Sequence, residues 1–284
     1  MESDEFGPPL RDVIAAHGLA TNKRLGQHFL LDLNLTRKIA RGAAPLEDAQ
    51  IIEIGPGPGG LTRALLMEGA RSIIAIERDR RCVEALADLV ARSDGRLTVV
   101  EGDALKLREE DLVGSGAHVK IVSNLPYNIS TALLTKWLTV PQWPPYFESL
   151  TLMFQREVAE RLIARPHTKD YGRLSVLTQW RMHACKLFDV PPQAFSPPPK
   201  VVSTVVSLVP IAQPEPAPLG ALQTVCAAAF NQRRKMLRSS LKSLGPPEAL
   251  LAASGIDGTL RAEDLDIPEF ARLARTYAQL HDAP

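Results

Sequence analysis

The sequence is poor in cysteine and histidine, and the few it has are scattered. Cys82, Cys185 and Cys226 form no C-x-x-C pair, and an odd, dispersed count is typical of unreactive thiols in a reducing compartment. The six histidines show no H-E-x-x-H motif or similar spacing. We therefore expect neither disulfides nor a metal site.

Long apolar runs are also absent. Stretches such as Val201 to Val209 stay far below the ~20 residues that a membrane-spanning helix needs. The first residues are acidic and lack the apolar run of a secretory signal peptide. These absences predict a cytoplasmic protein that does not bind membranes.

The third absence is an excess of charge of one sign. Lys and Arg total 33 and Asp and Glu total 32, a net charge of +1. This balance argues against a uniformly basic nucleic-acid binder and against an acidic tail protein, but a sum does not exclude a local basic patch. At roughly 100–200 residues per domain, the 284 residues form one large domain or two unequal ones.

From about residue 50 onward, short apolar runs alternate with longer amphipathic segments. The runs are β-branched and unalternating, as in strands buried on both faces. A strand–helix–strand order at this spacing predicts a parallel sheet with right-handed crossovers. The expected strands are 50–54, 72–76, 97–100, 119–122, 150–154, 184–190 and 201–209, and the expected helices are 60–69, 79–92 and 156–164. We predict an α/β domain over residues 1–210.

The character of the chain changes after residue 210. Residues 210–220 carry four prolines and are typical of a semi-rigid linker. Apolar residues beyond it recur at helical spacing, and the expected helices are 222–230, 231–244, 248–253 and 268–280. We predict a small all-helical domain over residues 211–284.

A glycine-rich loop, EIGPGPGG at 53–60, lies where the first predicted strand turns into its helix. Its glycines satisfy G-x-G-x-x-G, so a dinucleotide site is one interpretation. Pro56 and Pro58 carry no N–H, however, and this removes donors that a pyrophosphate needs. Glu53 at the same mouth repels phosphate and attracts an ammonium group. The loop therefore favours S-adenosylmethionine, which has an amino-acid end and a sulfonium cation.

Two acidic residues end the next predicted strands. Glu77 can accept both hydroxyls of a ribose through its two oxygens, which supports a nucleoside without choosing between NAD and S-adenosylmethionine. Asp103 can accept from an adenine amino group, although Asp is also common in ordinary turns.

The segment SNLPYN at 123–128 follows the fourth predicted strand. The Asn124 side-chain oxygen and a backbone carbonyl near Leu125 can accept the two amino protons of an adenine. These hydrogen bonds favour a tetrahedral nitrogen, whose lone pair can then attack a sulfonium methyl. Pro126 stiffens the turn so that these acceptors are preorganised. Tyr127 can stack on the base, a contact of about 1–3 kcal/mol. The alternative is a simple strand-to-loop turn.

Together these motifs resemble the ribosomal RNA adenine dimethyltransferase family along nearly the whole chain. The matching segments are 23–30 (KRLGQHFL), 53–62, Glu77, 102–104, 124–127, 153–155, 171–174 and 195–201 (FSPPPKV). The resemblance implies a Rossmann-like class I S-adenosylmethionine-dependent methyltransferase fold with a small all-helical C-terminal domain. It also implies that an N-terminal extension, 1–48, carries part of the cofactor site.

The resemblance implies roles for individual residues as well. Phe195 and Tyr127 would hold the target adenine, beside Asn124, Leu125 and Pro126. His28 stands where an asparagine is more usual, which leaves open a contact by side chain or by backbone. The implied cofactor-binding residues are Gln27, His28, Leu30, Gly55, Gly57, Glu77, Asp103, Ala104 and Asn124.

The family converts two adjacent adenosines, in a hairpin near the 3′ end of small-subunit ribosomal RNA, to 6,6-dimethyladenosine by four methyl transfers. The stretch 231–242 holds five basic residues and no acidic one, and on a helix three of them would form an i, i+4, i+8 stripe. We interpret this stripe as an RNA contact. The predicted RNA-binding residues are Arg233, Arg234, Lys235, Arg238 and Lys242.

Three alternatives stay open at this point. The chain can be an assembly factor that binds the immature small subunit irrespective of methylation, a role that is compatible with the enzyme. It can be a nicotinamide oxidoreductase, on the G-x-G-x-x-G pattern alone. It can also belong to a resistance branch that methylates large-subunit RNA. By resemblance we expect a monomer that acts on an immature small-subunit particle.

Overall fold

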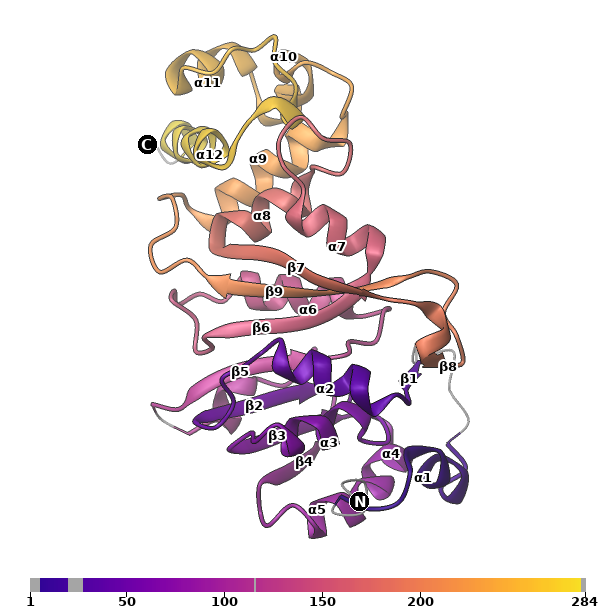
Figure 1. Cartoon of the computed structure of the whole chain (residues 1–284). Coiled ribbons are helices and arrows are strands. Elements are labelled where there is room, and N and C mark those ends of the chain that lie inside the picture. The colour runs from indigo at the N-terminus through magenta and orange to yellow at the C-terminus, as the bar shows by residue number, and fades with distance from the viewer. Residues whose placement is uncertain (1–5, 20–27, 115, 282–284) are drawn as a thin grey trace. The chain divides into compact units, whose positions relative to one another are not determined.

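The computed structural model describes residues 6–19, 28–114 and 116–281, so the predicted cofactor residue Gln27 lies outside the described residues. The chain forms two compact units (Figure 1). The first comprises Met1–Trp137, Pro145–Ala159 and Cys185–Val209, and the second comprises Leu138–Pro144, Glu160–Ala184 and Pro210–Pro284.

A seven-stranded sheet organises the first unit. Its strand order is β4-β3-β2-β5-β6-β9-β7, in which the first five strands are parallel and β9 runs antiparallel to β6. The strands are β2 (Ala49–Ile54), β3 (Ser72–Glu77), β4 (Leu97–Glu101), β5 (His118–Ser123), β6 (Ser149–Gln155), β7 (Met182–Val190) and β9 (Ser203–Pro210). All seven predicted strands are present within a few residues of their expected bounds.

Helices and short segments connect these strands. The predicted helix 79–92 is two short helices, α4 (Arg80–Ala85) and α5 (Ala87–Ala91), and Leu86 packs in the core between them. The other elements are α1 (Leu10–Ala16), β1 (Phe29–Leu30), α2 (Leu33–Arg41), α3 (Gly60–Met67), η2 (Glu109–Leu112), α6 (Ser130–Leu138), α7 (Arg156–Ile163), η3 (Pro192–Ala194) and β8 (Phe195–Ser196). Within the described ranges 6–19, 28–114 and 116–281, every helix is too short or too polar to span a lipid bilayer.

The core of the first unit follows the alternation of the strands. Ile51 and Ile73 pack with Ile39 of α2 and Leu65 of α3 in one cluster. Ile52 is fully buried too, on the opposite face of its strand. Because both faces of the central strands are buried, these strands are apolar without alternation, as the sequence predicted.

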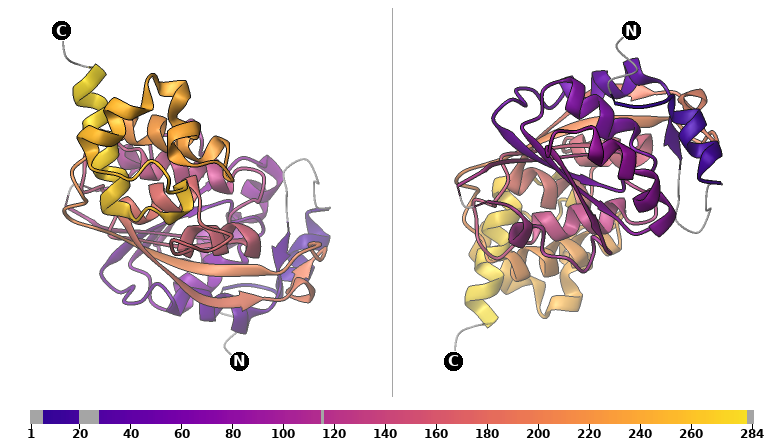
Figure 2. Two further views of the ribbon diagram at one scale, coloured as in Figure 1. Left: turned by 90° about the horizontal axis from the view of Figure 1, so that it is seen from above. Right: turned by 90° about the horizontal axis from the view of Figure 1, so that it is seen from below.

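The second unit is helical and is larger than predicted. Tyr171, Val176 and Trp180 share one hydrophobic cluster with Leu222 and Phe270, so residues between 164 and 180 pack with the C-terminal helices. Figure 2 shows the orange and yellow helices of this unit gathered around one another. Its elements are α8 (Arg173–Arg181), α9 (Leu219–Asn231), α10 (Leu237–Ser240), η4 (Leu241–Leu244), α11 (Pro247–Ser254), η5 (Ala262–Asp264) and α12 (Ile267–His281).

The predicted continuous helix 231–244 is wrong. After α9 the chain turns, and Met236 forms an isolated bridge with Arg261. The backbone N–H of Leu237 donates to the Leu260 carbonyl over 2.7 Å, and that of Arg238 donates to the Gly258 carbonyl over 3.0 Å. Because these N–H groups bond a distant segment, they do not form i to i−4 helical bonds. The predicted i, i+4, i+8 basic stripe therefore does not form.

The packing of residues 160–184 in the second unit makes a testable prediction. Tyr171 is fully buried, and its hydroxyl donates to the Leu265 carbonyl over 2.9 Å. Tyr171→Phe removes this donor and keeps the ring, so we expect a loss of about 1–2 kcal/mol in the free energy of unfolding of this unit in urea. Tyr277→Phe is the matched control, because the Tyr277 hydroxyl bonds no described residue, and it should stay within about 0.5 kcal/mol of wild type. Equal losses in the two variants would contradict this assignment.

Candidate functional site

A pocket opens at the carboxyl ends of the central strands of the first unit. The segments that follow β2, β3, β4 and β5 all contribute to it, together with the start of β1. The sheet order reverses at β2, whose neighbours are β3 and β5, and ligands of open α/β sheets bind at such a switch point. The lining residues are 28–30, 53–58, Gly60, Leu61, 76–78, 102–104 and 124–129.

The glycine-rich loop turns tightly below this pocket. Gly55 and Gly57 have φ values of +66° and +56°, which side chains rarely adopt. A Cβ on Gly57 would lie 3.1 Å from the Phe29 ring, so the loop and β1 approach each other closely.

The N–H groups of three loop glycines are bonded within the protein. Gly55 donates to the Ile76 carbonyl over 2.9 Å, Gly57 donates to Glu77 Oε2 over 3.0 Å, and Gly59 donates to the Pro56 carbonyl over 3.0 Å. Pro56 and Pro58 have no N–H to offer. From Gly55 to Gly59 the loop therefore offers no free N–H donor to a pyrophosphate, which argues against a dinucleotide site.

Three carboxylates surround the pocket instead. Glu53 is 2% exposed, and Thr62 Oγ1 donates to its Oε2 over 2.7 Å. Burial raises the pKa of Glu53 to about 8, the Thr62 hydrogen bond opposes that shift, and the charge of Glu77 adds to it. A cation that binds next to a buried carboxyl with a raised pKa stabilises the ionised form of that carboxyl.

Glu77 ends β3 with its carboxylate held by the backbone. Its Oε1 accepts from the N–H groups of Arg78 (2.7 Å) and Asp79 (2.8 Å). Burial raises the pKa of Glu77, and the backbone hydrogen bonds, including that from Gly57, oppose this shift. The third carboxylate, Asp103, accepts from the Leu105 N–H (3.1 Å) and lies 3.5 Å from Arg78 Nη1.

The turn after β5 places Asn124 at the pocket with a defined amide orientation. Its Nδ2 donates to the His28 carbonyl over 3.3 Å, and no described residue donates to its Oδ1. Among the residues that the structure describes, the amide oxygen is thus an acceptor without a donor. The turn is anchored one residue earlier, where Ser123 Oγ donates to the Ile54 carbonyl over 2.6 Å.

Both the backbone and the side chain of His28 make contacts in the site. Its ring Nδ1 lies 2.8 Å from the Pro197 carbonyl, and because a carbonyl can only accept, Nδ1 carries the proton. The ring centroid lies 5.4 Å from that of Tyr127 and 6.3 Å from that of Phe195. The side chain therefore belongs to the aromatic group of the site, while the backbone carbonyl orients Asn124.

Phe195, which the resemblance places at the target adenine, is buried. It is 4% exposed, pairs with Leu30 across the β1–β8 ladder, packs in the core cluster and does not line the pocket. Its edge reaches the site through the His28 ring. The other described residues that the sequence assigned to catalysis or to the cofactor all line the pocket: His28, Leu30, Gly55, Gly57, Glu77, Asp103, Ala104, Asn124, Leu125, Pro126 and Tyr127.

The sequence does not predict two of the contacts in the site. The hydroxyl of Tyr127 bonds Ser203 Oγ over 2.5 Å, and Pro197 holds the His28 ring. Both partners lie far along the chain from the residues they contact, and no local pattern indicates such a pairing.

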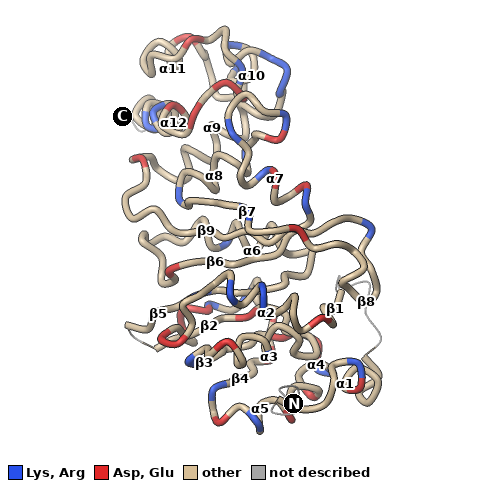
Figure 3. The backbone as a smooth tube through the Cα atoms, in the orientation of Figure 1, with Lys and Arg blue, Asp and Glu red and all other residues tan. Residues whose placement is uncertain are grey.

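The predicted RNA-binding residues all lie in the second unit. Arg233 is half-buried: its Nε donates to Glu263 Oε2 over 2.9 Å and its Nη2 donates to the Thr168 carbonyl over 3.0 Å. The remaining four are exposed: Arg234, Lys235, Arg238 and Lys242. Figure 3 shows basic segments near α10 and in the loop between α7 and α8.

Comparisons with known proteins agree with this geometry. Residues 18–279 match the family model described as Ribosomal RNA adenine dimethylase. A relative from Chelativorans sp. (strain BNC1), named Ribosomal RNA small subunit methyltransferase A, is 62% identical over 268 residues, which cover 94% of this chain and 97% of the relative. The protein of the same name from Xanthobacter autotrophicus is 61% identical over 96% of this chain and 95% of its own length.

Solved structures show the same architecture. A dimethyladenosine transferase from Plasmodium falciparum superposes with a TM-score of 0.74 at 26% identity, over 87% of this chain and 96% of that chain. The 23S rRNA methyltransferase ErmE superposes with a TM-score of 0.65 at 27% identity, over 88% of this chain and 100% of that chain. The predicted Rossmann-like class I methyltransferase fold with a helical C-terminal region is confirmed, and the chain belongs to the ribosomal RNA adenine dimethylase family.

Proposed function

We propose that this chain transfers methyl groups from S-adenosylmethionine to the 6-amino groups of two adjacent adenosines, in a hairpin near the 3′ end of small-subunit ribosomal RNA. Family membership and the names of its relatives support the reaction class. The observation that carries the proposal is the amide of Asn124 at the pocket, whose nitrogen donates to the His28 carbonyl and whose oxygen accepts from none of the described residues.

The pocket fits S-adenosylmethionine by the chemistry of its side chains. Glu53 would face the ammonium group, Glu77 the ribose hydroxyls and Asp103 the adenine amino group. His28, Leu30, Gly55, Gly57, Ala104 and Asn124 would complete the contacts, with Gln27 as a further proposed contact. When bound, this cofactor supplies an activated methyl group on a sulfonium centre.

The residues of the turn prepare the target nitrogen for attack. Asn124 Oδ1 and the backbone carbonyl of Leu125 accept the two amino protons, which favours a tetrahedral nitrogen with a free lone pair. Pro126 fixes the turn, so no reorganisation is needed during reaction. Tyr127 offers its face to the base, and Phe195 supports this aromatic group through His28. After the first transfer one N–H remains, so one of the two acceptors loses its donor.

The proposed RNA contacts lie on the second unit. Arg233 is engaged by Glu263 and Thr168, so its role is to join the turn at 232–236 to the loop that carries Thr168. Arg165 and Lys169 of that loop are exposed, as are Arg234 and Lys235 of the turn. Phosphate groups are the natural partners of such exposed cations. Arg238 and Lys242 extend the proposed surface.

The small subunit is favoured over the large one as the source of the target RNA. Relatives named for the small subunit share about 60% of the sequence, whereas ErmE, named for 23S rRNA, shares 27%. The proposal extends to a monomer that acts in the cytoplasm on an immature small-subunit particle, and to a part in assembly of that particle.

The role of Asn124 predicts a separation of catalysis from binding. Asn124→Ala removes the preorganised acceptor, so we expect the rate of methyl transfer to under-methylated small subunits to fall about 100-fold or more. Affinity for S-adenosylhomocysteine, measured by calorimetry, should fall much less, because Asn124 is one of many proposed cofactor contacts. Asn34→Ala, an exposed asparagine on α2, is the matched control and should methylate normally.

The same variant tests the assembly role. If the chain also acts as an assembly factor, Asn124→Ala protein keeps its binding to immature small subunits while methylation is lost. Undiminished methylation by this variant would overturn the proposed role of Asn124.

The raised pKa of Glu53 predicts pH-dependent cofactor binding. Glu53 stays protonated up to about pH 8 in the free protein, and a bound ammonium group favours the ionised form, so binding expels a proton below that pH. Affinity for S-adenosylhomocysteine, which keeps the amino-acid end, should rise from pH 5 to pH 8, by at most about tenfold per pH unit. In Glu53→Gln, only other groups such as Glu77 still contribute to the pH dependence of this affinity. Equal slopes of log affinity against pH in wild type and Glu53→Gln would contradict an ammonium site at Glu53.

The exposed cations predict the salt dependence of RNA binding. For Arg234→Ala/Lys235→Ala, the slope of log affinity against log salt should fall by about 0.7 per lost phosphate contact, measured with a small-subunit RNA fragment. Arg234→Lys/Lys235→Arg keeps the charge and should keep the slope. An unchanged slope in the alanine variant would remove these residues from the proposed surface.

A further inference from the structure

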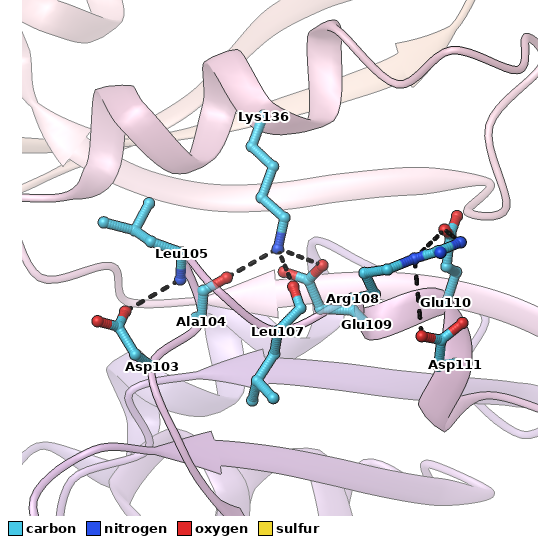
Figure 4. A network of polar contacts seen from close by, with 9 residues as sticks. All are labelled: Asp103, Ala104, Leu105, Leu107, Arg108, Glu109, Glu110, Asp111 and Lys136. Atoms are coloured by element: carbon cyan, nitrogen blue, oxygen red, sulfur yellow. Dashed lines mark hydrogen bonds and ion pairs between the residues drawn. The ribbon is translucent and has the colours of Figure 1, made fainter.

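Lys136 lies at the centre of a polar network that the proposed mechanism does not use. It projects from α6 towards the loop after β4, within the first unit (Figure 4). Its ammonium donates to the Ala104 carbonyl over 2.8 Å, to the Leu107 carbonyl, and to Glu109 Oε2 over 2.7 Å. A lysine ammonium has three N–H donors, and three oxygens of one short segment receive them.

This segment carries one side of the cofactor pocket. Asp103 and Ala104 line the pocket, and the Asp103 carbonyl accepts from the N–H groups of Lys106 (2.8 Å) and Leu107 (3.0 Å). These two bonds fold the chain into a tight turn. The carbonyls of Ala104 and Leu107, on the two sides of that turn, converge on Lys136. One side chain therefore fixes the turn that presents Asp103 and Ala104.

The helix that carries Lys136 also connects to the catalytic turn. α6 begins at Ser130, and Ser130 Oγ donates to the Tyr127 carbonyl over 3.1 Å. Lys136 thus links two loops at the pocket: the turn that presents Asn124 to the target base and the loop that presents Asp103 to the cofactor.

The contact with Glu109 has a different consequence. Glu109 is 2% exposed, and its other carboxylate oxygen has no hydrogen-bond partner among the described residues. A buried carboxylate that loses the cation paired with it is strongly destabilising. Lys136 therefore contributes to stability through Glu109 and to the shape of the pocket through the two carbonyls, and these two contributions can be separated.

We propose that Lys136 is a positioning residue for the cofactor, which holds the Asp103–Ala104 segment in its binding position through the Ala104 and Leu107 carbonyls. The assignment rests on the proposed use of S-adenosylmethionine. It adds to the cofactor site a residue that does not line the pocket.

The first test is Lys136→Met in the full chain, which keeps an unbranched side chain and removes the ammonium. We expect affinity for S-adenosylhomocysteine to fall about tenfold in calorimetry, and amide hydrogen exchange of residues 103–109 to rise in the ligand-free protein. In methylation assays the KM for S-adenosylmethionine should rise while kcat changes little. Lys106→Met is the matched control: Lys106 is an exposed lysine of the same segment and should behave as wild type.

The second test separates positioning from stability. Lys136→Met/Glu109→Gln removes the uncompensated buried charge, so thermal stability should recover relative to Lys136→Met. Affinity for S-adenosylhomocysteine should stay reduced, because the carbonyl contacts are still missing. Affinity that recovers with stability would show a structural role only and would overturn the assignment, as would wild-type affinity and exchange in Lys136→Met. Wild-type protein that fails to bind S-adenosylhomocysteine would overturn the proposed function itself.

Discussion

The parallel pairing of β2 with β3 on one side and β5 on the other is the constraint on which the site depends. The registers Ile51↔Ile73 and Ile51↔Lys120 align the three strands so that they end at one edge of the sheet. Connections leave β2 and β5 in opposite directions across the sheet, and this opens a crevice between their loops. The glycine loop, Glu77, Asp103 and Asn124 each follow a different strand, yet they meet at this crevice because of that order.

The electrostatics of the crevice select the kind of ligand it can hold. A nucleotide phosphate needs free N–H donors or cations, but the N–H groups of Gly55, Gly57 and Gly59 are bonded within the protein. Glu53 and Glu77 instead bring two buried carboxylates together, and burial makes their ionisation unfavourable. A cationic ligand with hydroxyl groups relieves both penalties. The same glycine pattern therefore serves different ligands, and neighbouring side chains make the choice.

Local patterns predicted the parts of the fold that local physics determines. The strands were predictable because runs such as 50–54 and 72–76 are buried on both faces, and the site residues on loops follow these strands directly. The break in the predicted helix 231–244 was not predictable. The N–H groups of Leu237 and Arg238 bond the segment 258–260, and no helical periodicity reveals that pairing. The grouping of α8 with the second unit depends likewise on packing between distant segments. Contacts such as His28 with Pro197 are invisible for the same reason.

The near-neutral net charge and the proposed RNA surface are compatible because many charges in the second unit are already paired. Arg233 is neutralised by Glu263, and Asp264 lies 3.2 Å from His167. These two acids are thus engaged, whereas Arg165, Lys169, Arg234 and Lys235 are exposed. A small set of exposed cations gives a modest electrostatic attraction to any polyanion. Under the proposed function, selection of one RNA comes from shape and from the fit of an unstacked adenine at Asn124 and Tyr127, where the proposed acceptors would distinguish an amino group from other base edges.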